Sequence, residues 1–396
     1  MVELEFSHTW SLPDALAEAL HRFEKREGIA VHVDILDHTR EQRQLSDFAI
    51  FRTGPDVSEV GTTWLSSLIS MGALSDFPPW EVDALKRGGA FFLPAWQPGV
   101  ERGATLAIPW RTDTRVIYYR RDLLHQAGID EATAFATVND LRQTLTRLQA
   151  LPGVLPCIIP TNRQPILLHV LAPWVWLAGG KFLREDGRKT LFAEPEALAG
   201  IVNYFDTFAP VLAPAAQGMS DNEVCAAFLT GRTAVTITGN WLLDSVQQQA
   251  DTLPDIASNL GLALTPGAQY RGGMSLVIWQ HSRHPKEAIK LIRFLTDPAF
   301  QTTDLRRAGH LPARQQALDS PPFTTDPHFR LIGESLRSAQ EFNAVYLWGL
   351  VEDRLTTAIS ALWQQIAADP NANVRDLVAG QLKPLAARLN RTLSAG

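Results

Sequence analysis

Cysteine is scarce in this sequence, in which Cys157 and Cys225 are the only two among 396 residues. So few cysteines exclude a disulfide-rich scaffold and a zinc site of the Cys-rich type. The sequence does not decide whether the two residues form a disulfide or remain separate thiols. We favour separate, buried thiols.

Long apolar runs and an excess of positive charge are also missing. No stretch approaches the roughly eighteen apolar residues that cross a bilayer. The chain has 36 Lys and Arg residues against 42 Asp and Glu residues, which gives a net charge of −6. Because nucleic-acid binding requires a basic face, this balance argues against a nucleic-acid partner.

The short motifs of common enzyme classes are absent. The sequence has no GxGxxG after a strand, no Walker A loop, no GxSxG elbow and no HExxH, and its ten histidines lack metal-ligand spacing. We therefore expect no cofactor, no metal site and no catalytic residue. Glycoside hydrolases carry few short signatures, so a hydrolase stays open as an alternative.

A signal peptide is not visible at the start. Met1 and Val2 lead directly into the strand-like residues Glu3 to Phe6, without a basic region or an apolar core. This leaves two alternatives, a cytoplasmic protein or one whose leader has been removed.

Strands and helices alternate along the first part of the chain. Apolar residues at helical spacing follow Leu4 and Phe6, with Ser11 as the expected N-cap, Pro13 in the first turn and Gly28 as the stop. An alternating strand follows at 31–35, and a third strand begins at Pro55-Asp56-Val57 and precedes a helix near Thr63. This βαβ order predicts a mostly parallel sheet covered by helices.

The later segments predict a second region of the same class. Residues 106–109, 116–119 and 274–278 are strand-like, and Thr137 to Asp140 has the spacing of a capping box. Residues 190–260 are mainly helical except for 233–238, and residues 329–394 are helical. The length predicts two domains. Since no low-complexity linker appears, we expect the domains to be joined by several short crossovers.

Six blocks, in order over nearly the whole chain, carry a family resemblance. They are Pro55 to Leu74, Ile108 to Gly128, Trp176 to Gly187, Phe228 to Trp241, Gly272 to Leu295, and Gly309 to Arg314. Each block alone is weak, but together they resemble the family 1 extracellular solute-binding proteins of ABC importers, the maltose-binding-protein-like family.

The resemblance implies an α/β protein with the two-lobed periplasmic-binding-protein fold of type II. In that fold a ligand cleft lies between the lobes, which three hinge crossovers join. Carried onto this sequence, the N-terminal lobe takes residues 1–111 and 267–313, the C-terminal lobe takes 112–266 and 314–396, and the crossovers lie near 110–114, 263–268 and 313–316.

The resemblance also implies a function. It predicts a monomeric solute-binding protein, not an enzyme, that delivers a mono- or oligosaccharide to the permease subunits of an ABC importer. The family works outside the cytoplasm, so we expect the periplasm or, for a lipoprotein, the outer face of the cell membrane.

Loops at the carboxyl ends of strands are the first candidates for ligand contact. The loop after the first strand offers His8 and Trp10, and the loop after the third strand offers Thr63. A sugar needs aromatic faces for its C–H surfaces and polar groups for its hydroxyls, and the chain is rich in tryptophan.

Further candidates come from the resemblance. Trp241, Trp348, Asp113 and His169 match or lie near family contact positions. Trp110 lies beside Asp113 in the sequence, and Gly273 and Met274 would bring backbone close to a ligand. The remaining tryptophans in regular patterns, which we expect in the core, are Trp64, Trp174, Trp176, Trp279 and Trp363.

Three alternatives remain. A charged or phosphorylated ligand such as glycerol phosphate would need converging arginines, for which Arg111 and Arg271 are the candidates. A glycoside hydrolase would need two carboxylates across a sugar, and Asp113 with Glu59 is the pair available. The third alternative is an interaction protein that binds no small molecule.

Overall fold

The computed structural model describes the chain except residues 1, 10–11, 38–39, 370 and 396. Contacts divide it into two compact units. The first unit comprises Met1–Asp113, Gly272–Arg330 and Ala344–Gly349, and the second comprises Thr114–Arg271, Leu331–Asn343 and Leu350–Gly396. The chain passes from the first unit to the second between Asp113 and Thr114, within the residues 110–114 at which a crossover is expected. It passes between the units again after Arg271, Arg330, Asn343 and Gly349.

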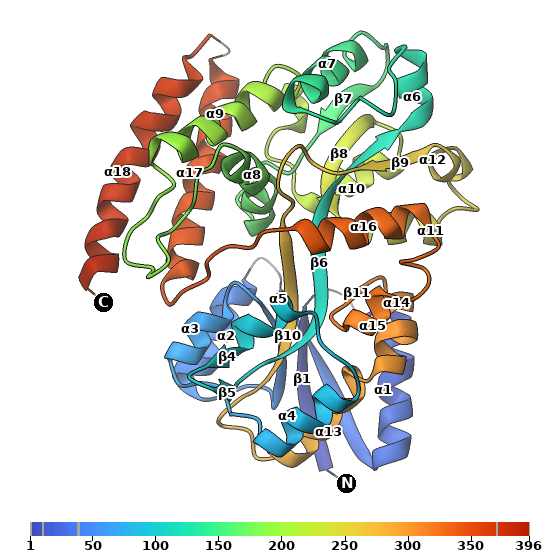
Figure 1. The fold of residues 1–396 in the computed structure, drawn as a ribbon, viewed down its shortest axis with the longest axis vertical. Helices are drawn as coiled ribbons and strands as arrows, with labels where there is room; N and C mark the ends of the chain where they lie inside the picture. Colours follow the sequence, from blue (N-terminus) through green and yellow to red (C-terminus); the bar gives the residue numbers. More distant parts are fainter. Residues whose placement is uncertain (1, 10–11, 38–39, 370, 396) are drawn as a thin grey trace. The chain divides into compact units, whose positions relative to one another are not determined.

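A mixed sheet forms the centre of the first unit (Figure 1). β1 (Val2–Thr9) pairs in parallel with both β2 (Ile29–Leu36) and β3 (Val57–Gly61). β10 (Arg271–Ile278) pairs antiparallel with β3. The next strand in the sheet is the first part of β6 (Ile108–Arg120), and β11 (Leu311–Pro312) pairs antiparallel with β6. The carboxyl ends of β1 and β3 therefore lie at the same edge.

Helices cover both faces of this sheet. On β10, Leu276 and Ile278 belong to one apolar cluster and Val277 to another, because successive side chains point to opposite faces. α1 (Asp14–Glu27) and α13 (Pro285–Leu295) pack on the first face, and α2 (Glu41–Phe51) and α3 (Leu65–Ser70) pack on the second. The smaller elements are α4 (Pro79–Arg87), α5 (Leu93–Trp96), η1 (Gln97–Gly99), β4 (Val100–Glu101), β5 (Ala104–Thr105), η3 (Phe300–Asp304), α14 (Leu305–Arg307) and α15 (Gln315–Leu318).

The second unit is built on the later part of β6. β8 (Thr233–Gly239) and β9 (Leu260–Ala263) pair antiparallel with β6, and β7 (Leu155–Ile158) pairs in parallel with β8. The register places Arg115 opposite Gly239.

Helices make up most of the second unit. α8 (Pro165–Leu177) packs on α9 (Pro195–Phe208), and α9 also packs on α18 (Val374–Ala395) (Figure 1). Their core is aromatic, with ring centroids of Trp174 and Tyr204 5.7 Å apart. The other helices are α6 (Arg121–Gln126), α7 (Val138–Leu148), η2 (Pro214–Ala216), α10 (Asp221–Leu229), α11 (Trp241–Gln248) and α12 (Pro254–Ser258); α16 (Pro327–Ser338) and α17 (Trp348–Ala368) begin in the first unit and continue here.

Most of the expected elements are confirmed. Gly28 ends α1 in the left-handed conformation with φ of 68°. Thr137 and Asp140 form the predicted capping box of α7, in which each side chain satisfies a backbone N–H. Three details differ: Pro13 is the N-cap residue of α1, α3 begins at Leu65, and the two strands expected at 106–109 and 116–119 are one strand, β6. The expected N-cap Ser11 lies outside the described residues.

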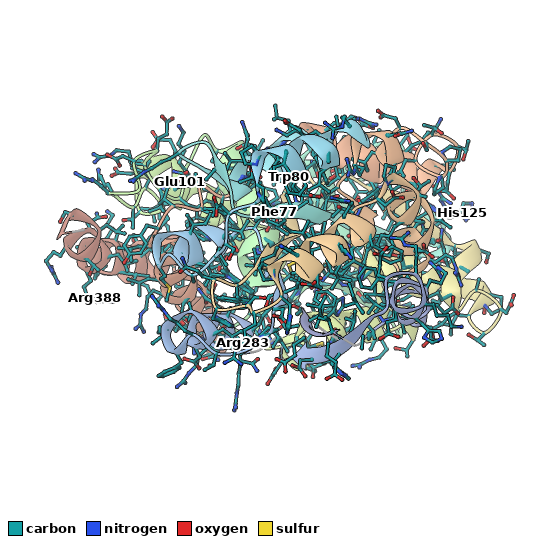
Figure 2. The ribbon with its side chains drawn as sticks, turned by 90° about the horizontal axis from the view of Figure 1, so that it is seen from below. Phe77, Trp80, Glu101, His125, Arg283 and Arg388 are labelled. Carbon is teal, nitrogen blue, oxygen red and sulfur yellow. The ribbon has the colours of Figure 1, made fainter. Side chains whose placement is uncertain are left out.

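The cysteines and the surface also agree with the sequence. Cys157 and Cys225 are free and buried. Charged side chains such as Glu101, Arg283 and Arg388 are exposed, whereas Phe77 is buried (Figure 2). Within the described ranges, no helix is both long and apolar enough to cross a membrane.

Candidate functional site

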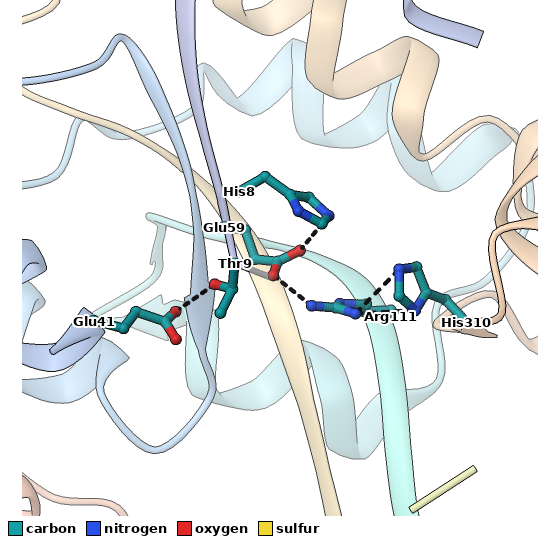
Figure 3. A network of polar contacts seen from close by, with 6 residues as sticks. All are labelled: His8, Thr9, Glu41, Glu59, Arg111 and His310. Atoms are coloured by element: carbon teal, nitrogen blue, oxygen red, sulfur yellow. Dashed lines mark hydrogen bonds and ion pairs between the residues drawn. The ribbon is translucent and has the colours of Figure 1, made fainter. Parts of the chain in front are cut away.

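Polar side chains gather in the first unit where β1 and β3 end (Figure 3). We call His8, Glu59, Trp110, Arg111 and His310 the first-unit cluster. His8 comes from the end of β1, Glu59 from β3 and Arg111 from β6, and His310 directly precedes β11. Parallel pairing of β1 and β3 explains why residues so distant in sequence meet here.

A buried ion pair holds this cluster together. Arg111 donates to the Glu59 carboxylate, whose side chain is fully buried. Nη1 of the same arginine lies 3.0 Å from Nδ1 and 3.2 Å from Nε2 of His310. His8 Nε2 lies 3.7 Å from Glu59 Oε2. Burial, and then the charge of Arg111, hold the pKa of His310 well below 6.5, so its ring stays neutral beside the cation.

A second buried carboxyl lies next to the first-unit cluster. Thr9 Oγ1 donates to Glu41 Oε1 over 2.7 Å (Figure 3). Burial raises the pKa of Glu41 from 4.5 to about 8, and the nearby Glu59 adds to the rise. The protonated form of this carboxyl is therefore favoured at neutral pH, which avoids a second negative charge beside Glu59.

Trp110 forms the apolar wall of the first-unit cluster. Its ring is fully buried and meets His8 and His310 edge to face, with centroids 5.7 and 6.4 Å away. The side-chain amide of Gln301 donates to its backbone carbonyl over 2.7 Å. These contacts fix the indole in the core of the unit.

Aromatic rings dominate the corresponding cluster of the second unit. We call Arg115, His169, Trp176, Trp241, Tyr270 and Phe342 the second-unit cluster. The carbon Cζ of Arg115 lies 4.8 Å from the ring centroid of Trp241 and 5.0 Å from that of Tyr270. Its Nη2 lies 2.8 Å from Nδ1 of His169. Both cation–π contacts and the hydrogen bond are thus made by one nearly buried guanidinium.

The position of Trp241 depends on a glycine. A Cβ added to Gly239 would lie 2.2 Å from Cζ3 of the Trp241 ring. Only glycine lets the indole lie this close to β8 at the pair formed by Gly239 and Arg115. Trp241 remains partly exposed. The indole is therefore held against the sheet while part of its surface stays open.

The other rings extend this aromatic surface. His169 stacks on Tyr270 with centroids 4.3 Å apart and planes 11° apart. The plane of Trp176 is within 3° of that of Tyr270, at 6.5 Å. Phe342 lies 5.6 Å from Tyr270 and 5.8 Å from Trp176. These rings combine apolar faces with the polar groups of Arg115 and His169.

The structure distributes the predicted site residues over both units. His8 and Trp110 lie in the first-unit cluster, and His169 and Trp241 in the second-unit cluster. Thr63, Asp113 and Met274 are partly buried, Gly273 is packed so closely that a Cβ would lie 2.5 Å from the Arg111 carbonyl, and Trp348 is fully buried. Trp10 lies outside the described residues. A contact of any of these residues with a solute stays a prediction.

Sequence reasoning missed several members of the clusters and one neighbour. Arg115, Tyr270, His310 and Phe342 were not predicted, nor was Glu41 beside the first-unit cluster. Arg115 stands two residues after Asp113, so strand alternation could have placed both on one face. Of the tryptophans expected in the core, Trp174, Trp279 and Trp363 are buried, whereas Trp64 and Trp176 are partly exposed.

Within the described part of the chain, no group of three or more His, Cys, Asp or Glu side chains could hold a metal ion. The two clusters instead offer hydrogen-bond donors, acceptors and aromatic faces, which suit an organic molecule.

Comparison with known proteins gives the family. The profile described as "Bacterial extracellular solute-binding protein" matches residues 9–302. The chain belongs to this family. Solved structures of solute-binding proteins are also similar to the present one over nearly its whole length. An ABC transporter solute-binding protein from Thermotoga lettingae TMO, solved with α-D-tagatose, has a TM-score of 0.85 at 20% identity, covering 99% of this chain and all of that one.

Two further solute-binding proteins are similar to this chain. Maltose-bound MalE3 of T. maritima has a TM-score of 0.83 at 23% identity over 97% of this chain and 100% of its own. The diacetylchitobiose binding protein DasA of Streptomyces coelicolor is 23% identical over 78% of this solute-binding protein and 71% of its own length. The α/β fold of the two-lobed periplasmic binding proteins, expected from the sequence, is confirmed.

Proposed function

We propose that this solute-binding protein captures a carbohydrate outside the cytoplasm and delivers it to an ABC importer. The observation that carries the carbohydrate assignment is the second-unit cluster. Trp241 lies against Gly239 with part of its surface exposed, beside the donors of Arg115 and the ring of His169. Sugars are bound by this combination of a flat apolar face and nearby polar groups.

The magnitude of such a contact is sufficient for binding. Covering one face of an aromatic ring contributes about 1.5–3 kcal/mol. With several hydrogen bonds added and the cost of association subtracted, we expect micromolar affinity, which is about −8 kcal/mol. The names of the relatives support the same class, since they were solved with or are named for tagatose, maltose and diacetylchitobiose.

A charged ligand is less well supported. Arg111 is paired with Glu59, and Arg271 donates to the carbonyls of Leu336 and Ala339 and lies 3.7 Å from the Glu341 carboxylate. Both arginines suggested for a phosphate therefore have partners within the protein. A hydrolase is not favoured either, because the Glu59 carboxylate is fully buried in its ion pair with Arg111.

A thermal-shift screen tests the carbohydrate assignment. The panel contains maltose, diacetylchitobiose, D-tagatose and D-mannitol, with glycerol phosphate as the charged comparison. We expect a sugar to raise the melting temperature, because a molecule that binds only the folded state stabilises it. A shift with glycerol phosphate and none with any sugar would overturn the assignment.

Turnover is tested with the same sugar. Incubation overnight at substrate excess should leave the sugar intact, since we propose a binding protein and not an enzyme. More cleaved product than protein would contradict this. We further propose that the protein acts as a monomer and that its partner is the permease of the importer, which sedimentation and transport assays in a deletion strain would test.

A further inference from the structure

One ring nitrogen of the second-unit cluster makes no hydrogen bond within the described part of the chain. This nitrogen is Nε2 of His169, which is buried and has no hydrogen-bond partner among the described residues. The other ring nitrogen of His169, Nδ1, lies 2.8 Å from Nη2 of Arg115. Buried polar atoms are nearly always hydrogen-bonded in folded proteins, so this one requires an explanation.

Arg115 decides which nitrogen of His169 carries the proton. A guanidinium is always protonated and can only donate, so Nδ1 of His169 must accept. In a neutral imidazole the proton is then on Nε2. Burial, together with the charge of Arg115, holds the pKa of His169 well below 6.5, which keeps the ring neutral. His169 therefore presents one N–H donor at Nε2.

The neighbours of His169 do not accept this proton. The ring stacks on Tyr270 at 4.3 Å and lies 5.9 Å from Phe342, and ring faces are weak acceptors. Arg115 offers only donors. The residue His169 is partly exposed although Nε2 itself is buried, so a solute at the exposed part must displace little of α8 to reach the ring.

We propose that the bound solute supplies the missing acceptor, with an oxygen placed against Nε2–H of His169, and that Arg115 is the positioning residue that selects this tautomer. This inference rests on the proposed function and adds a specificity determinant to it. It requires that the solute carry an oxygen with a free lone pair at this point, as a hydroxyl, acetamido or carboxylate group does.

Two substitutions of His169 separate the two nitrogens. His169→Asn keeps an oxygen near the Nδ1 position, where Arg115 can donate, and removes the donor at Nε2. His169→Gln places an amide N–H near the Nε2 position and removes the acceptor at Nδ1. The matched control is His125→Asn, an exposed histidine of α6 in the same unit.

The assay is calorimetric titration with the panel sugar that gives the largest thermal shift in the wild type. We expect His169→Asn to weaken binding by about tenfold or more, while His169→Gln stays within about threefold of wild type and His125→Asn is unchanged. A melting curve on each variant confirms that it is folded.

The tautomer is measured separately in the wild type. Two-bond ¹H–¹⁵N correlation spectra should show a protonated Nε2 and a bare Nδ1 on His169, and saturating sugar should slow the exchange of the Nε2 proton. This measurement does not depend on whether the variants fold. A proton on Nδ1, or a sugar-bound state with unchanged Nε2–H exchange, would overturn the inference.

The outcomes distinguish this inference from the proposed function. If no panel sugar stabilises the wild type, the proposed function fails and this inference fails with it. If a sugar binds and His169→Asn binds it as tightly as wild type does, only the inference fails, and Nε2–H serves the fold through water instead.

Discussion

Replacing Gly239 with alanine should weaken solute binding through the displacement of one ring. The added Cβ would lie 2.2 Å from Cζ3, 2.3 Å from Cη2 and 2.5 Å from Cε3 of Trp241, which is far inside van der Waals contact. Gly239 does not have a positive φ, so its backbone conformation accepts alanine. The indole must therefore move, because it is the flexible partner in this contact.

The magnitude follows from what the ring loses. Forcing a methyl group into a packed site costs about 1–3 kcal/mol of folding free energy. If Trp241 is the platform for the solute, its displacement removes a contact of about 1.5–3 kcal/mol, which weakens binding by about ten- to a hundredfold. The Arg115 guanidinium, 4.8 Å from the ring centroid, would lose its cation–π partner as well.

A matched control separates steric damage from loss of the platform. A Cβ on Gly261 would lie 2.2 Å from Cε2 and Cζ of Tyr119, which is the same kind of collision in the same unit. Tyr119 packs on Phe135, at 4.8 Å, and is not a member of the second-unit cluster. Gly261→Ala should therefore lower the melting temperature and leave the affinity unchanged.

A double-mutant cycle gives the decisive result. Trp241→Ala alone should weaken binding about as much as Gly239→Ala alone. Once the ring is absent, the extra methyl group has nothing to displace, so the double variant should bind no more weakly than Trp241→Ala. Additive losses in calorimetry, or equal losses for the Gly239 and Gly261 variants, would refute the reasoning.

Three further outcomes are expected. Gly380 lies exposed inside α18 with no atom within 4 Å of an added Cβ, so Gly380→Ala should raise the free energy of unfolding by about 0.5–1 kcal/mol in urea titration, and a loss would contradict the helix there. Arg111→Met leaves the buried carboxylate of Glu59 without its cation and should cost about 3–5 kcal/mol of stability, whereas a neutral result would show that the ion pair is not formed. The pKa of Glu41 is raised from 4.5 to about 8, so its contribution to stability is complete below pH 4.5 and is lost as the pH rises through about 8. In chemical denaturation, the free energy of unfolding of Glu41→Gln should therefore fall less than that of the wild type between pH 6.5 and 8.5. If the two free energies change in parallel with pH, the pKa of Glu41 is not raised.

Local signals in the sequence predicted most of the fold. Capping, glycine stops and alternation depend on neighbouring residues, so the helix at Thr137, the end of α1 at Gly28 and strand β8 could be predicted. The sequence predicts two strands, at 106–109 and 116–119, where the structure has the single strand β6. In the structure Thr112, Thr114 and Arg115 are buried within this strand. Of the polar residues in this strand, Arg111 and Arg115 belong to the two clusters.

The membership of the clusters could not be predicted in the same way. The hydrogen bond between Arg115 and His169 joins residues 54 positions apart, and that between Arg111 and His310 joins residues 199 apart. Neither periodicity nor spacing carries information about such pairs. The family resemblance suggested His169 and Trp241 by position alone, and it could not show that Gly239 holds Trp241 or that Arg115 selects the tautomer of His169.

Each unit, taken by itself, uses the same solution to hold a cation within its cluster. An arginine of β6 contacts a histidine that burial and the arginine keep neutral, His310 in the first unit and His169 in the second. In both clusters the neutral imidazole satisfies a guanidinium donor, and in the first unit the Glu59 carboxylate also pairs with Arg111. Because both histidines have a pKa well below 6.5, their contribution to stability is present above pH 6.5 and is lost as the pH falls and protonation sets them against the arginines. This acid loss is opposite in sign to the effect of Glu41, so the protein should be most stable near neutral pH, where both arginines keep their imidazole partners.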